Sequence, residues 1–454
     1  MVILMLKYLN RNSLCAHDAA HTMRERLYGS IHGRGTDKMK RWLFALSLAG
    51  LVALFGCSRY TPKETQAVKG PAPEESTERE TSGIKVIEGA GPNGDKTISI
   101  RIVDEDDPAL PGRTPVKVRG IYISGLMAGN TDELYRILDS AAGTQINTVV
   151  IDLKDDEGRM TCQMDTPLVT EIGACRPYIK DIEGLISSLK ERGLYVIARI
   201  VAFRDPYLAE KKPEWALTME DGTLYRDRQG MTWANPYKKE VWDYLAEIGA
   251  GASKLGFDEV QFDYIRFPTD GNIKSVVFCE DSTDCRKKTD VITEFVQYEY
   301  ESLAPLGLFV SADVFGTIIG SGIDAEAVGQ IYTEMAKHLD YICPMIYPSH
   351  YGDGNFGIEH PDMEPYRTIL AALEQSREVL KEAQKADREA HQAIVRPWLQ
   401  DFTASYLTHY IPYGNDEVAA QIRAVTDAGY DEWMLWSAAN RYHFGGVPAK
   451  EAEE

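Results

Sequence analysis

The sequence predicts a (β/α)8 TIM barrel between residues 116 and 445. Eight short runs rich in apolar, β-branched and aromatic residues recur along this segment, and a helix-like stretch separates each from the next. Such alternation over about 330 residues is typical of a barrel with its helices outside. A doubly wound open sheet is the competing fold. It is disfavoured because residues 125–130, after the first strand, read GLMAGN rather than the phosphate-binding GxGxxG.

The strands and helices can be placed in order along the chain. The predicted strands are residues 119–124, 146–154, 195–201, 259–267, 308–316, 341–349, 394–402 and 431–438. The predicted helices are residues 131–142, 181–192, 237–254, 289–304, 325–338, 365–391 and 416–428. The helix at 365–391 carries many charged residues, which is typical of a long solvated helix.

A targeting segment precedes the barrel. Residues 39–57 read MKRWLFALSLAGLVALFGC, a basic start and an apolar run that ends at a cysteine. The apolar part, 43–55, is shorter than the ~20 residues that a membrane-spanning helix needs. The stretch resembles a bacterial lipoprotein signal peptide over 39–56, with the lipid placed on Cys57. Residues 1–38 are then an upstream extension.

The region between this targeting segment and the barrel, 57–115, is rich in Pro, Glu, Thr, Ser and Gly. That composition buries too little apolar surface to order itself, so we expect a low-complexity tether. Two alternating stretches within it, 84–87 and 97–103, are expected to pair as a small hairpin. Residues 446–454 are expected to form an acidic tail.

Charge and cysteine usage limit the class of protein. The formal net charge is −20, whereas a general nucleic-acid binder needs a basic face. Two close cysteine pairs favour disulfides in an oxidising compartment: Cys279 with Cys285, and Cys162 with Cys175. A metal site is the weaker alternative for these cysteines, because no CxxC spacing supports it. We expect no nucleic-acid partner and an extracytoplasmic, lipid-anchored protein.

Polar and aromatic residues recur at the predicted carboxyl ends of the strands. In a TIM barrel these ends meet at one mouth, where side chains escape the packed interior. The candidates for substrate contact are Asp152, Lys154, Arg199, Arg266, Tyr347, Trp398, Asp401 and Trp436. Asp263 and Asp313, which end neighbouring predicted strands, are the candidate catalytic residues.

A carboxylate pair beside aromatic platforms suits glycoside hydrolysis. One carboxylic acid protonates the leaving oxygen, and a carboxylate acts as nucleophile or base. Arg199 or Arg266 would keep one carboxylate ionised, while burial raises the pKa of the other. Each candidate also has a structural interpretation. Asp263 could pair with Arg266, Asp152 could pair with Lys154, Asp313 and Asp401 could cap a strand end or loop, and both tryptophans could belong to the core.

These segments resemble a known family. The runs RGIYIS, NTVVIDLKDDEG, GFDEVQFDYIRFP, SADVFG, ICPMIYPS, RPWLQDF and WMLWSAAN are similar to the bacterial putative glycosyl hydrolase domain of secreted proteins and lipoproteins. The resemblance covers nearly all of 116–445 and implies a TIM barrel that acts on carbohydrate.

A more distant similarity is to amylase-like and chitinase-type barrels. Chitinase-type barrels carry DxxDxDxE on the fourth strand, Met-x-Tyr on the sixth and a tryptophan on the eighth. The positions that agree with this pattern here are Asp258, Asp263, Met345, Tyr347 and Trp436. Gln261 and Ile265 depart from it, and Ile265 replaces the general-acid glutamate. We therefore prefer the amylase-like alternative, with Asp263 as nucleophile and an acid from the fifth strand.

The sequence as a whole predicts an extracytoplasmic glycoside hydrolase that acts on a cell-wall or extracellular polysaccharide. The alternative is a non-catalytic, glycan-binding surface lipoprotein, which would need the aromatic platforms but not both carboxylates. A metal-dependent deacetylase is disfavoured, because no HxxxH-type pair lies near a strand end. We expect no metal and no cofactor, a glycan as substrate, and a membrane contact through the lipid on Cys57.

Overall fold

A computed structural model describes residues 85–90, 96–101, 113–279 and 285–450 of the 454-residue chain. The expected upstream extension, the signal peptide with Cys57, and most of the tether lie outside the described residues. The described part has two units, a hairpin and a barrel.

The hairpin pairs β1 (Lys85–Ala90) with β2 (Lys96–Arg101) in antiparallel register, with Lys85 opposite Arg101. This pairing confirms the small hairpin that the alternating sequence predicts.

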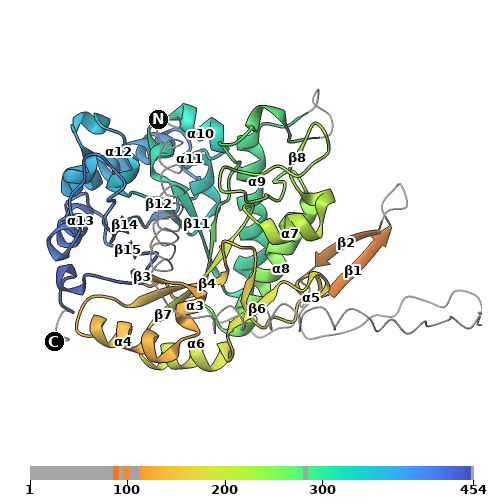
Figure 1. Cartoon of the computed structure of the whole chain (residues 1–454), viewed down its shortest axis with the longest axis horizontal. Coiled ribbons are helices and arrows are strands. Elements are labelled where there is room, and N and C mark those ends of the chain that lie inside the picture. Colours follow the sequence, from red (N-terminus) through yellow and green to blue (C-terminus); the bar gives the residue numbers. More distant parts are fainter. Residues whose placement is uncertain (1–84, 91–95, 102–112, 280–284, 451–454) are drawn as a thin grey trace, which may run out of the picture. The chain divides into compact units, whose positions relative to one another are not determined.

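The barrel is a closed ring of eight parallel strands (Figure 1). The strands are β3 (Arg119–Ile123), β4 (Thr148–Lys154), β7 (Tyr195–Val201), β9 (Glu259–Asp263), β11 (Phe309–Phe315), β12 (Tyr341–Met345), β14 (Trp398–Gln400) and β15 (Trp433–Trp436). Each pairs with the next, and β15 pairs with β3 to close the ring. The predicted TIM barrel is confirmed.

Two elements differ from the predicted boundaries. The strand expected at 394–402 is divided into β13 (Ile394–Val395) and β14, because Pro397 between them has no N–H for the ladder. The helix expected at 325–338 is divided into α10 (Gly322–Val328), α11 (Tyr332–Met335) and a 3-10 turn. Gly329, at φ +82°, ends α10.

The remaining elements surround the ring or extend its loops. The helices are α3 (Gly125–Ala128), α4 (Thr131–Ala141), α5 (Pro167–Ile172), α6 (Ile182–Glu191), α7 (Pro206–Lys211), α8 (Lys239–Leu255), α9 (Lys288–Leu303), α12 (Pro365–Ala386) and α13 (Asn415–Asp427). The loop strands are β5 (Met160–Cys162), β6 (Cys175–Ile179), β8 (Thr218–Met219) and β10 (Val276–Val277). Figure 1 shows the long helices on the outside of the ring. No described helix has both the length and the apolar character that a membrane span requires.

The core has two layers because successive strand residues point to opposite faces. Tyr122, Val150 and Ile197 belong to one buried cluster, whereas their neighbours Ile121 and Val149 belong to the larger one beneath the helices. All seven residues of β4 and of β7 are buried. The ring is thus a packed interior whose free surface lies at its ends.

A buried ion cluster lies near the amino ends of the strands. Arg396 donates from Nη1 to both carboxylate oxygens of Glu259, at 2.8 and 3.0 Å, and from Nε to Glu432 at 2.8 Å. Ser311 also donates to Glu259, at 2.5 Å. These contacts compensate the charges that burial would otherwise leave unsolvated.

The barrel extends beyond its predicted limits at both ends. Arg113, within the expected tether, donates to Asp340 at 2.7 Å and to the Leu308 carbonyl. At the other end, the Lys450 N–H donates to the Gly143 carbonyl, so the expected tail begins with residues that pack on the barrel.

The two cysteine pairs have different outcomes. Cys279 and Cys285 form a disulfide, as predicted. The prediction for Cys162 and Cys175 is wrong in this structure, where both are free thiols. Their strands pair with Cys162 opposite Ile179, and with Cys175 opposite Met160, so the two sulfurs are out of register.

Candidate active site

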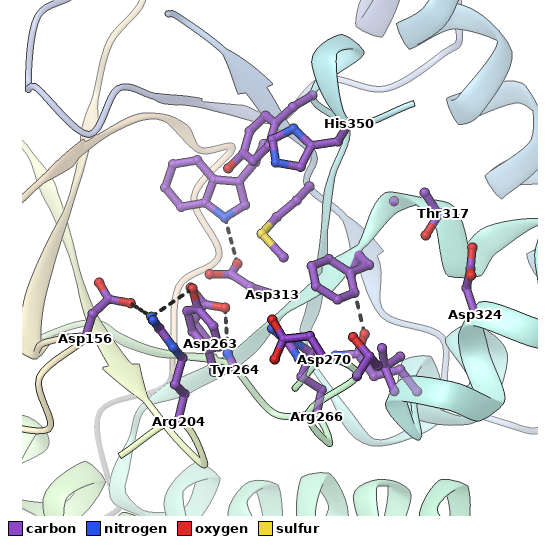
Figure 2. A pocket seen from close by; sticks show the side chains of 18 of the residues that line it. Asp156, Arg204, Asp263, Tyr264, Arg266, Asp270, Asp313, Thr317, Asp324 and His350 are labelled. Atoms are coloured by element: carbon purple, nitrogen blue, oxygen red, sulfur yellow. Dashed lines mark hydrogen bonds and ion pairs between the residues drawn. The ribbon is translucent and has the colours of Figure 1, made fainter. Parts of the chain in front are cut away.

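A cavity of about 430 Å³ opens among the carboxyl ends of the strands. Seven of the predicted site residues line it: Arg199, Asp263, Arg266, Asp313, Tyr347, Trp398 and Trp436. Figure 2 shows Asp263 and Asp313 next to one another, with Asp270, Thr317 and Asp324 farther along the wall. The cavity therefore lies at the carboxyl ends of the strands, where the sites of TIM barrels are found.

The stretch after β9 explains why a buried strand ends in a carboxylate. Tyr264 adopts a left-handed conformation, with φ +53°, which is uncommon for a bulky residue. Its backbone N–H donates to the Asp263 carboxylate at 2.6 Å. This turn stops the strand and holds Asp263 at the mouth, while Ile265 and Phe267 return to the core.

Arg199 forms an ion pair with Asp263. Its Nη2 and Nε donate to the same Asp263 oxygen, at 2.6 and 3.1 Å. Its Nη1 donates to Asp152 at 2.7 Å. The guanidinium is 1% exposed, so water screens these pairs weakly. Asp263 thus accepts two hydrogen bonds from a buried cation.

Asp152 accepts this hydrogen bond from Arg199 but does not itself line the cavity. It also accepts a hydrogen bond from the Tyr122 hydroxyl at 2.6 Å. Burial raises its pKa to about 6, against the opposing effect of Arg199. Its place in the structure is that of a positioning residue.

Asp313 has the opposite environment. It is 2% exposed, and its one hydrogen bond among the described side chains comes from the Trp398 indole, whose Nε1 donates to Oδ1 at 2.7 Å. Burial raises the pKa of Asp313 well above its usual value, and the negative charge of Asp263 raises it further. The two carboxyl groups of one cavity thus have different environments, an ion pair for Asp263 and burial against an indole for Asp313.

Aromatic rings form one side of the cavity. Trp398 and Trp436 meet edge to face, with their centroids 5.5 Å apart. Trp436 stacks on Tyr122 at 4.1 Å, and Tyr347 packs edge-on against Phe402. The tryptophans therefore belong to the packed interior and line the cavity at once.

Besides Asp152, two predicted contacts lie away from the cavity. Lys154 is fully buried and forms an ion pair with Asp205 at 2.7 Å. Asp401 is 1% exposed and accepts hydrogen bonds from the His443 backbone and ring, at 2.9 and 2.6 Å. Asp401 thus keeps its structural interpretation. The suggested Asp152–Lys154 pair is wrong, because Asp152 pairs with Arg199 and Lys154 with Asp205.

Sequence reasoning missed several lining residues on the loops. Arg204 contacts Asp227, Gln229 and the Tyr264 hydroxyl, and lies 3.8 Å from Asp156. These residues lie on loops, whereas the prediction considered residues at the carboxyl ends of strands. The run VIDLKDDEG, with its carboxylates just past β4, was the one local hint of Asp156.

Arg266 is held differently from the other arginines of the cavity. Its guanidinium lies over the rings of Trp233 and Phe315, at 4.9 and 4.8 Å, and donates to the Phe267 carbonyl. None of the carboxylates in the described ranges lies within ion-pair distance of it, so the alternative of an Asp263–Arg266 pair is wrong. Arg266 is a donor available at the cavity wall.

Comparisons with known proteins agree with this fold. Residues 120–442 match the sequence profile of a family described as a putative glycosyl hydrolase domain. No curated protein matches the chain. Among solved structures, the chain is similar to the glycoside hydrolase domain of PgaB (BpsB) from Bordetella bronchiseptica. They share 12% identity over 72% of this chain and 95% of that chain, with a TM-score of 0.50.

Two other solved structures are similar over part of the chain. One is a hypothetical protein from Ruminiclostridium thermocellum, with 39% identity over 43% of this chain and 97% of that chain, and a TM-score of 0.39. The other is an alpha-galactosidase from Thermus thermophilus, with 14% identity over 72% of this chain and 60% of that chain, and a TM-score of 0.41.

Proposed function

Because the chain belongs to the putative glycosyl hydrolase domain family, we propose that it hydrolyses a glycosidic bond of a polysaccharide with Asp263 and Asp313 as its carboxylate pair. The observation that carries this proposal is the contrast between the two groups. Asp263 is paired with a buried guanidinium, whereas Asp313 is buried against an indole N–H with its pKa raised.

The division of roles follows from protonation. The raised pKa of Asp313 favours its protonated form, which donates the proton to the leaving oxygen of the glycosidic bond. Asp263, paired with Arg199, attacks the anomeric carbon as the leaving oxygen departs. Water, deprotonated by Asp313, then hydrolyses the glycosyl–Asp263 ester and frees both carboxyl groups. Asp152 and Tyr122 hold Arg199 in place, so that they act on the reaction through Asp263.

The rest of the cavity suits a sugar. A volume of about 430 Å³ falls within the usual range of ligand pockets. Trp436 and Phe315 offer flat faces for the C–H surface of a ring, while Arg266 offers N–H donors for its oxygens. The family assignment and this lining together favour a glycan substrate.

The location of the protein is part of the proposal. The lipoprotein-like stretch at 39–57 would anchor the chain through Cys57, with residues between it and the barrel as a spacer. The disulfide between Cys279 and Cys285 supports an oxidising compartment outside the cytoplasm. The substrate is then a cell-wall or extracellular polysaccharide.

The test follows reducing ends released from a panel of bacterial cell-wall and extracellular polysaccharides, with the purified full-length protein and its Asp263→Asn variant. We expect release by the parent, but not by the variant. Asparagine retains the shape and an acceptor for the Tyr264 N–H, so the fold should survive. Circular dichroism checks this.

The rival function is glycan binding without cleavage. Equal binding of one glycan by the parent and by Asp263→Asn, with no release by either, would contradict the hydrolase proposal and support the binding protein. The rival needs the aromatic faces but has no use for the protonation contrast between Asp263 and Asp313.

A further prediction concerns Trp398→Phe. The indole N–H stabilises the ionised form of Asp313 and so lowers the pKa of Asp313 against the larger effect of burial. Without this donor, that pKa rises further. We therefore expect the alkaline limb of the pH–kcat profile to move to higher pH. A limb at the parental pH would mean that the indole does not act on the titrating group.

A further inference from the structure

Three potential metal ligands from two loops meet outside the cavity. Asp353 and His360 lie on the loop that follows β12, and His409 lies on the loop that follows β14. One ligand atom from each lies within 4.8 Å of those of the other two. None of the three lines the cavity. No metal site is expected here from the sequence, because His360 and His409 are far apart along the chain. The fold brings them together across two loops.

The separations within this cluster suit a small ion. His360 Nδ1 lies 3.1 Å from one Asp353 oxygen, and His409 Nδ1 lies 3.4 Å from the other. Zinc binds imidazole and carboxylate at about 2.0–2.1 Å in a tetrahedron, whose ligands are then roughly 3.3–3.4 Å apart. The two measured nitrogen–oxygen distances are close to that spacing.

His360 has an unused nitrogen that faces the cluster. Its Nδ1 is buried and makes no hydrogen bond with any residue in the described ranges. The Asp353 oxygen is near enough, but its direction does not suit a hydrogen bond. A purely hydrogen-bonded trio would align this nitrogen with the carboxylate. A buried ring nitrogen without a hydrogen-bond partner is available to coordinate a cation.

The opposite side of the His360 ring has the partner that a metal ligand needs. Glu359 Oε1 lies 3.7 Å from His360 Nε2. In metal sites the second imidazole nitrogen commonly donates to a carboxylate, which fixes the tautomer and makes the coordinating nitrogen more basic. At 3.7 Å the two atoms form no hydrogen bond, but the Glu359 side chain is 89% exposed and can turn toward Nε2 to fix the tautomer that leaves Nδ1 free to coordinate.

The two imidazole rings are stacked, with centroids 3.7 Å apart and planes at 29°. Their in-plane lone pairs therefore do not yet converge on one point. His409 has 44% of its side chain exposed and Asp353 62%, so turning these side chains meets little packing. His360, with 25% exposed, is the fixed member.

We propose that Asp353, His360 and His409 bind a divalent transition-metal ion such as Zn²⁺, with water completing the coordination on the exposed side. Two nitrogens and one carboxylate oxygen are a donor set that zinc and its neighbours accept, whereas calcium and magnesium take oxygen ligands. The ion joins the loop after β12 to the loop after β14. Because the cluster lies outside the cavity, its role is to fix two loops at the mouth rather than to activate a water for the reaction.

The test is isothermal titration of ZnCl₂ into the purified, EDTA-treated full-length protein and into His409→Ala. We expect one zinc per chain for the parent. Loss of the ligand should weaken binding by more than the roughly 10–100-fold that loss of an outer partner costs. Glu359→Ala, which removes such a partner, should fall within that range. His338→Ala removes a histidine outside the cluster and should bind zinc as the parent does.

Thermal unfolding gives a second readout that needs no substrate. Zinc should raise the Tm of the parent and of His338→Ala, but not of His409→Ala, because an ion bound only to the folded state stabilises it. Absence of zinc binding by the parent, or equal affinity for the parent and His409→Ala, would overturn the proposal. Neither readout depends on glycan hydrolysis, so the outcome is independent of the proposed enzymatic activity.

Discussion

Asp313→Asn should lower kcat for an ordinary sugar–sugar bond by roughly 10²–10⁴-fold, the usual contribution of a general acid. This loss corresponds to about 3–5 kcal/mol of the activation barrier. Asparagine keeps the acceptor for the Trp398 indole but has no proton to give to the leaving oxygen. The measurement is the steady-state rate of reducing-end release from the glycan that the parent cleaves.

The leaving group distinguishes a lost acid from a disturbed site. A nitrophenolate leaves without being protonated, so Asp313→Asn should lose much less kcat/KM, which reports the first bond cleavage, on a nitrophenyl glycoside than on a sugar–sugar bond. Asp324→Asn is the matched control, because it changes another carboxylate of the same cavity. An equal loss on both substrates for Asp313→Asn would show that Asp313 acts in some way other than as the acid.

The pH profile tests the same assignment. Asp313 must be protonated to act, and burial, with the charge of Asp263, raises the pKa of Asp313. Parental activity should therefore fall as the pH rises through that elevated pKa. Asp313→Asn should lack this alkaline limb, whereas Asp324→Asn should retain it. A limb that persists in Asp313→Asn belongs to another group.

The fold was predictable because its signals are local. Apolar runs of strand length and the helices between them follow from periodicity, and each falls within a few residues of its place in the structure. Two predicted elements had wrong boundaries, and in both a single residue explains the difference. Gly329 ends α10 early, and Pro397 interrupts the seventh strand. The contact of residues 448–450 with 143–145 is long-range, and no local pattern indicates it.

The site was partly predictable, because a strand end is a local feature but the direction of its side chain is not. From the sequence, polar residues at the carboxyl ends of the strands are expected to meet at the barrel mouth. This expectation placed Asp263 and Asp313 there. It did not hold for Asp152, Lys154 and Asp401, which lie outside the cavity lining, since it cannot say which residue of another segment pairs with them. It also missed the loop residues Arg204 and Asp227, which join the cavity only after the loops fold over it.

Lys154→Met should lower the free energy of unfolding by about 3–5 kcal/mol, the usual cost of removing one partner of a buried ion pair. The Lys154 ammonium lies 2.7 Å from Asp205 and donates to the Val201 carbonyl at 2.5 Å, and both charged side chains are 0% exposed. Methionine fills most of the volume but leaves the Asp205 charge uncompensated. Urea unfolding, followed by fluorescence, measures the change.

A second substitution tests whether the loss comes from that charge. Asp205 also accepts the Leu208 N–H at 2.8 Å and so caps α7 (Pro206–Lys211), a role that asparagine retains. Adding Asp205→Asn to Lys154→Met should therefore recover most of the lost stability, because a neutral amide replaces the unpaired carboxylate. The two explanations of Lys154 make opposite predictions. A structural ion pair lowers stability and leaves KM unchanged, whereas a substrate contact, as the sequence alone suggested, would raise KM and leave the unfolding free energy near the parental value.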